Sequence, residues 1–136
     1  MNEHEEYERN CSAIREENVT LLDGFETWMT SNGLSGATAK KHRENIDFYI
    51  NEYLLYDSQK HASEGVDEVG MFLGYWFIRK AMWANVASPR TNSTSLKKVY
   101  DFMLEHGEVE PEEVKEMNRE NQERLARMGS NNEAIR

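Results

Sequence analysis

The chain has little cysteine and little proline, and the scarcity of cysteine excludes internal disulfides. Its 136 residues include one cysteine, Cys11, and two prolines. A single cysteine cannot form an internal disulfide, and the four histidines do not lie near it at the spacings typical of metal ligands. We therefore expect no disulfide, no metal site and no other cofactor.

Long apolar runs are also missing. The longest one, residues 71–78, is far shorter than the roughly 20 residues that a membrane-spanning helix needs. The first ten residues are acidic and polar, whereas a secretory signal has basic residues followed by apolar ones. These absences predict a cytoplasmic protein that does not bind membranes.

Acidic residues outnumber basic ones, but unevenly along the chain. The net charge is −9. Residues 1–34 hold two basic and eight acidic side chains, a net charge of −6. Residues 101–136 hold five basic and ten acidic side chains, a net charge of −5, whereas residues 35–100 hold nine basic and seven acidic side chains, a net charge of +2. This distribution permits a local anion-binding surface in the middle of the chain, although the overall field would repel nucleic acid at long range.

The apolar residues follow helical spacing, and no stretch alternates apolar and polar residues as strands do. We predict an all-α fold with helices at about 14–30, from about 36 to a polar loop at 57–65, at about 66–84, from about 93 to Gly107, and from Pro111 to about 128. The first four helices form one domain, residues 14–107, and residues 108–128 form an accessory C-terminal helix. Residues 1–13 are predicted to be a flexible acidic N-terminus and residues 129–136 a disordered tail.

The sharpest functional feature is a basic cluster at the start of the second helix. After a break at 31–36, the chain restarts with Thr38, Lys40, Lys41 and Arg43. Cations near the positive end of a helix dipole are unfavourable unless an anion compensates them, and a phosphate backbone is one such anion. The alternative is a solvated helix face, because an acidic residue follows both Lys40 and Arg43 at the four-residue spacing of ordinary surface ion pairs.

No catalytic arrangement is visible in the sequence. His42 and His106 have no nearby nucleophile or patterned carboxylate, and we interpret both as surface histidines. Trp76 and Trp83 lie seven residues apart in an apolar helix, which indicates core residues rather than a platform for stacking bases. We predict that the chain is not an enzyme.

The run 33–38 has the sequence GLSGAT, follows an aromatic-rich helix, and leads into basic residues at 40–43 and aromatic residues at 48–49. This order resembles the N-terminal core-binding domain of phage-integrase-type tyrosine recombinases, and residues 93–104 are similar to the fourth helix of that domain. The resemblance covers about residues 18–107. It implies a SAM-like, all-α bundle of four core helices that forms half of a clamp around duplex DNA.

Carried over to this sequence, the resemblance places DNA-contacting residues on the second and fourth helices: Thr38, Lys40, Lys41, Arg43, Lys97 and Lys98. Strand exchange in this family, a step of DNA recombination, also requires a second domain with a nucleophilic tyrosine, and only about thirty polar residues follow position 107. The expected function is therefore non-catalytic contact with the phosphates of duplex DNA.

The alternative is a protein-interaction module or a self-associating helical domain with no nucleic-acid role. The C-terminal helix would then bind a protein partner or a second copy of the chain. Its sparse apolar stripe would be buried in that contact: Val114, Met117, Leu125 and Met128.

Overall fold

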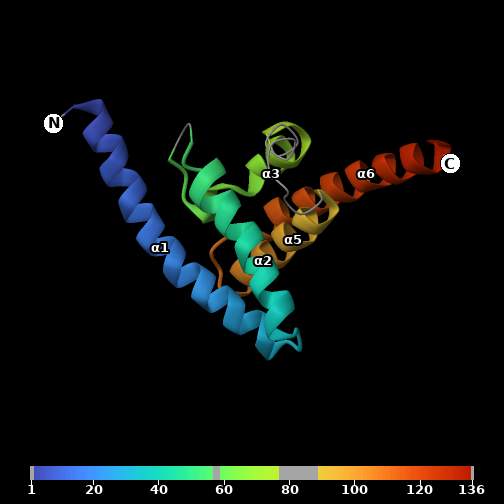
Figure 1. Cartoon of the computed structure of the whole chain (residues 1–136), viewed down its shortest axis with the longest axis horizontal. Helices are drawn as coiled ribbons and strands as arrows, with labels where there is room; N and C mark the ends of the chain where they lie inside the picture. Colours follow the sequence, from blue (N-terminus) through green and yellow to red (C-terminus); the bar gives the residue numbers. More distant parts are fainter. Residues whose placement is uncertain (1, 57–58, 77–88, 136) are drawn as a thin grey trace. The chain divides into compact units, whose positions relative to one another are not determined.

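The structure is a computed structural model that describes residues 2–56, 59–76 and 89–135 of the 136-residue chain. These residues form helices joined by turns and contain no β-strand (Figure 1). The all-α fold class predicted from the sequence is therefore confirmed for the described part of the chain. The chain divides into two compact units, which we call unit 1 (Met1–Gly65) and unit 2 (Val66–Arg136).

Unit 1 is built on two long helices that pack against each other. Helix α1 (Glu3–Ser31) and helix α2 (Gly36–Phe48) are joined by a short turn (Figure 1). A π-helical turn, η1 (Tyr49–Tyr53), continues α2, and a 3₁₀ turn, η2 (Ala62–Glu64), follows. The buried apolar side chains of α1 recur at three- and four-residue spacing, as expected for one face of a helix: Cys11, Ile14, Leu22, Phe25 and Met29. Those that follow the turn include Ala39, Ile46, Tyr49, Ile50, Leu54 and Leu55.

Polar side chains also link α1 to η1. Asn18 is only 2% exposed, and its Nδ2 donates a hydrogen bond to Asn51 Oδ1 at 2.8 Å. Asn51 Nδ2 in turn donates to Asp47 Oδ1 at 2.6 Å. A buried amide is costly unless it is hydrogen-bonded, so this link favours one register between the two segments.

The turn after α1 has the geometry of a Schellman cap. Gly33 takes a left-handed conformation with φ of 99°, its N–H donates to Thr30 O at 3.1 Å, and Leu34 N–H donates to Met29 O at 3.1 Å. Glycine adopts positive φ without the steric penalty of a Cβ atom. The predicted end of the first helix at residues 31–33 is therefore confirmed.

Unit 2 begins with three short helical turns. They are η3 (Val66–Glu68), α3 (Val69–Met71) and η4 (Phe72–Trp76), and two longer helices follow, α5 (Pro89–Glu105) and α6 (Pro111–Ile135). Helix α6 packs against both α5 and α3. The buried apolar side chains include Val66, Val69, Phe72, Leu73, Leu96, Val99, Tyr100, Phe102, Met103, Val109, Val114 and Met117.

The boundaries of three helices differ from the sequence prediction. Helix α1 begins at Glu3, so most of the predicted flexible segment 1–13 is helical; Asn2 caps it, and Cys11 and Tyr7 pack on Leu55. Helix α5 is already helical at Pro89, where the described residues resume, rather than beginning near 93. Proline is tolerated in the first turn of a helix, where no N–H partner is needed. Helix α6 continues to Ile135, past the predicted end at 128.

The predicted domain organisation also differs from the two units. The predicted domain 14–107 extends over both, and the helix predicted as an accessory, 108–128, packs within unit 2. The predicted third helix begins with the turns at Val66–Trp76, where Val69, Phe72 and Leu73 are buried. Its predicted continuation to residue 84 and the side chains of both tryptophans assigned to it lie outside the described residues.

Candidate nucleic-acid interface

The first turns of α2 present two exposed lysines. Ser35 is the N-cap: its Oγ accepts a hydrogen bond from Thr38 N–H at 3.2 Å, and its hydroxyl donates to Thr38 Oγ1 at 3.0 Å. This cap starts the helix at Gly36, as the sequence predicts. Lys40 and Lys41 then fall in the first two turns, and both are exposed.

Within the described residues, neither lysine forms a hydrogen bond or an ion pair. The first N–H groups of a helix lack intrahelical partners, and the helix dipole makes this end positive. Lys40 and Lys41 therefore add two uncompensated charges to an end that already favours an anion.

Arg43 is held differently from the lysines. Its Nη1 donates to Asp23 Oδ1 at 2.7 Å and to Glu26 Oε1 at 3.0 Å, both on α1. The hydrogen bond to Asp23 is the largest of the effects that raise the pKa of Arg43 above its ordinary value, while burial opposes it. Arg43 thus ties α2 to α1, and two carboxylates already compensate its charge.

Asp23 and Glu26 are the partners that the sequence interpretation missed. They lie three residues apart near the end of α1, a few residues before the turn, as Arg43 lies a few residues after it. Residues at similar distances from the turn of two antiparallel helices face each other. Opposite charges placed in this way on both sides of a predicted turn are a signal that could have identified the pairing.

The two candidate lysines of α5 belong to unit 2. Lys97 Nζ pairs with Asp101 Oδ2 at 3.0 Å, one helical turn further on. Lys98 is half-buried, and it forms no ion pair within the described part of the chain. The six candidate residues therefore form two sets, four on or near the start of α2 in unit 1 and two on α5 in unit 2.

The apolar stripe proposed for partner binding is partly covered within unit 2. Val114 and Met117 are each 3% exposed, whereas the side chains of the other two stripe residues lie outside the described residues. On the exposed face of α6, Arg119 pairs with Glu116 and Glu123. The hydrogen bond from Arg119 lowers the pKa of Glu116, so this face compensates its own charges.

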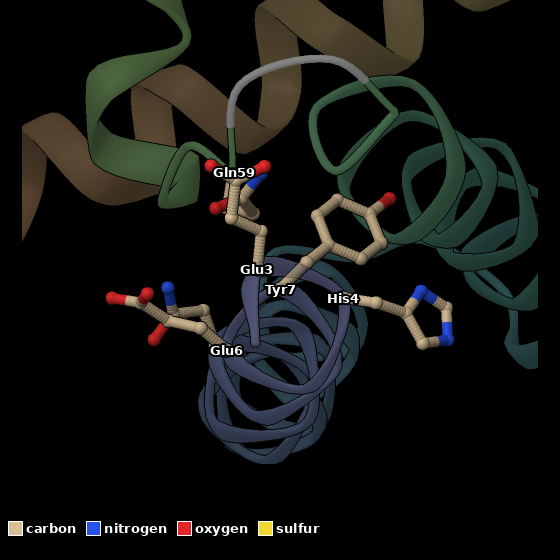
Figure 2. Close-up of a pocket in the computed structure, with 6 residues that line it drawn as sticks. Glu3, His4, Glu6, Tyr7 and Gln59 are labelled. Carbon is tan, nitrogen blue, oxygen red and sulfur yellow. The ribbon is translucent and has the colours of Figure 1, made fainter. Parts of the chain in front are cut away.

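An open concavity lies at the beginning of α1. It is lined by Glu3, His4, Glu6, Tyr7, Asn10 and Gln59. Figure 2 shows the side chains of His4 and Glu6 pointing to opposite sides of the helix. The Tyr7 hydroxyl is already engaged, since it donates to Leu55 O at 2.6 Å, and burial raises the pKa of this phenol. The lining groups do not converge on one point, so we assign no ligand to this concavity.

The histidines show no catalytic or metal-binding arrangement in the described residues. The interpretation of His42 as a surface residue is wrong: it is 8% exposed, because it lies between the fully buried Ala39 and Ile46 on the inner face of α2. His106 directly follows α5, and its Nδ1 lies 3.0 Å from Phe102 O of that helix. The described part of the chain contains no group of three or more His, Cys, Asp or Glu side chains that could hold a metal ion.

Comparison with known proteins identifies no relative. No family model, no curated protein and no solved structure matches the chain. Among the helices described, none combines the length and the apolar character needed to cross a membrane. The resemblance to recombinase core-binding domains stays a prediction.

Proposed function

We propose that this chain is a non-catalytic, cytoplasmic nucleic-acid-binding protein that contacts the phosphates of duplex DNA through the first turns of α2. The observation that carries the proposal is the exposure of Lys40 and Lys41, uncompensated within the described residues, beside the N-terminal end of that helix. The resemblance to recombinase core-binding domains supports duplex DNA as the polyanion.

The contact would neutralise phosphates without reading bases. Lysine ammonium groups act as point charges on flexible stems, and phosphate contacts of this kind position a protein on DNA but carry no sequence information. Arg43 has a positioning role, because it fixes α2 on α1 through Asp23 and Glu26. In unit 2, Lys98 is the better candidate for an additional contact, since Lys97 is paired with Asp101.

Binding should be weak and sensitive to salt. Unit 1 holds six basic and thirteen acidic side chains, a net charge of −7, and unit 2 holds ten and twelve, a net charge of −2. Both units therefore repel DNA at long range, and only short-range contact at the start of α2 opposes this.

The test compares two double variants by fluorescence anisotropy with labelled duplex DNA at low salt. The double variant Lys40→Gln, Lys41→Gln removes the proposed contact, and because glutamine has about the same helix propensity as lysine, helix α2 should persist. The control, Arg9→Gln with Lys115→Gln, removes two exposed charges of the same sign from α1 and α6. We expect about a tenfold or greater loss of affinity in the first variant and a much smaller change in the control.

Equal losses in both variants would show only a dependence on net charge and would overturn the proposed surface. If the natural chain does not bind DNA even at low salt, the nucleic-acid proposal fails. The net charge of unit 1 then favours the second candidate, a protein-interaction module that binds through its acidic helices.

A further inference from the structure

We propose that Asn32 is a site of spontaneous deamidation and that the C-terminal cap of α1 controls the rate. Asn32 and Gly33 form the only asparagine–glycine pair in the sequence. This pair is the most reactive context for deamidation, because glycine has no side chain to hinder attack by its own backbone nitrogen. The inference is independent of the proposed DNA contact.

The reaction needs only solvent. The Gly33 amide nitrogen loses its proton and attacks Cγ of Asn32, the Cγ–Nδ2 bond breaks, and Nδ2 leaves as ammonia. The resulting five-membered imide then takes up one water molecule at either carbonyl carbon. The products are an aspartate or an isoaspartate at position 32, and no oxidant or cofactor is consumed.

The site is open to solvent. Asn32 and Gly33 are both exposed, and apart from the two chain neighbours of Gly33 no described residue has an atom within 4 Å of the position that a Cβ on Gly33 would occupy. Hydroxide and water therefore reach the reacting atoms freely. Steric shielding cannot slow the reaction here, so any protection must come from conformation and hydrogen bonding.

The folded cap provides such protection in three ways. Gly33 N–H, whose proton must be lost, donates to Thr30 O at 3.1 Å. Asn32 Nδ2, the leaving group, donates to Trp28 O at 2.7 Å. The ψ angle of Asn32 is 15°, so the Gly33 nitrogen nearly eclipses the Asn32 nitrogen instead of lying next to Cβ, as ring closure requires.

Deamidation would weaken the cap. The new carboxylate loses the Nδ2 donor to Trp28 O and puts a negative charge at the negative end of the α1 dipole. Isoaspartate also adds a methylene to the backbone of a turn with fixed hydrogen bonds. The turn that leads to the N-cap Ser35 would loosen irreversibly.

The first test measures deamidation of Asn32 by peptide mapping and mass spectrometry in mildly alkaline buffer, with and without guanidinium chloride. Asn10, an exposed asparagine of α1 followed by Cys11, is the internal control. We expect Asn32 to react much faster than Asn10 in the denatured chain. We expect Asn32 to react at least about tenfold more slowly in the folded chain than in the denatured chain, which corresponds to a free energy of about 1.4 kcal/mol or more for local opening of the cap. Equal rates in both conditions, or no reaction in denaturant, would overturn the proposal.

A matched pair of variants tests the cap itself. Leu34→Pro removes the N–H that donates to Met29 O, and Leu34→Ala keeps it while also losing the leucine side chain. We expect Leu34→Pro to raise the rate in the folded chain toward the rate in denaturant, with circular dichroism confirming that the helices persist. A Leu34→Pro rate no higher than that of Leu34→Ala would contradict control by the cap.

Discussion

At the scale of single residues, Arg43 shows how the fold changes the meaning of a basic cluster. The spacing of Lys40, Lys41 and Arg43 suggests three similar cations, but only the lysines are left uncompensated within the described residues. Arg43 binds two carboxylates of α1 with good hydrogen-bond geometry. Its contribution is therefore to the packing of the two helices.

This role predicts a cost in stability. Replacing Arg43 by glutamine leaves Asp23 and Glu26 without their partner, and we expect the free energy of unfolding to fall by about 1 kcal/mol. The loss is this small because the Asp23 side chain is 65% exposed, so that solvent screens its charge. Lys97→Gln breaks an exposed pair within one helix and should cost at most about 0.5 kcal/mol. Urea titrations of both variants measure the difference, and equal costs would argue against an interhelical tie.

Single residues also show what the sequence can and cannot predict. The start of α2 near residue 36 was predicted and is confirmed, and Ser35 caps it. Ala39, Ile46 and Ile50 lie on its buried side, in keeping with the helical spacing of the apolar residues. Asn18 was not predicted, because a polar side chain is normally assigned to the surface. It lies four residues from both Ile14 and Leu22, so its position on the buried face was readable from the spacing.

At the scale of elements, the two described interhelical turns that follow α1 and α5 use the same device. Gly107 has φ of 71°, its N–H donates to Leu104 O at 3.0 Å, and Glu108 N–H donates to Met103 O at 2.9 Å. These bonds repeat those around Gly33 after α1. The ends of α1 and α5 were predicted because both turns require a glycine at positive φ, whereas the end of α6 was placed too early, at residue 128. The helical segments at Glu3 and Pro89 were missed because polar residues and proline also occur in loops.

The substitution of glycine by alanine should therefore change the stability of the chain in opposite directions at different glycines. Gly33→Ala and Gly107→Ala should each destabilise the chain by about 1 kcal/mol, since alanine is strained at positive φ even though both positions have open space. Gly36→Ala, at the first position of α2 with equally open surroundings, should be neutral or stabilising by up to about 1 kcal/mol. Thermal unfolding of the three variants tests this, and a similar shift in all three would contradict it.

At the scale of the whole molecule, the division into two units was not predicted. Residues 57–65 read as a polar loop inside one domain, and local sequence does not show which helices pack together. The same limit applies to the candidate site. Its lysines were predicted from the start of α2, but the carboxylates that compensate Arg43 lie about 20 residues away in the sequence and meet it only through folding.

The most direct test of the phosphate contact is the salt dependence of duplex DNA binding by the natural chain. If Lys40 and Lys41 each neutralise one phosphate, the logarithm of the binding constant should fall with the logarithm of salt concentration with a slope of about −1.8. The slope should become shallower by about 1.8 when both lysines are replaced by glutamine. A slope that is unchanged by this substitution, or the absence of binding by the natural chain at low salt, would contradict a phosphate-binding surface at the start of α2.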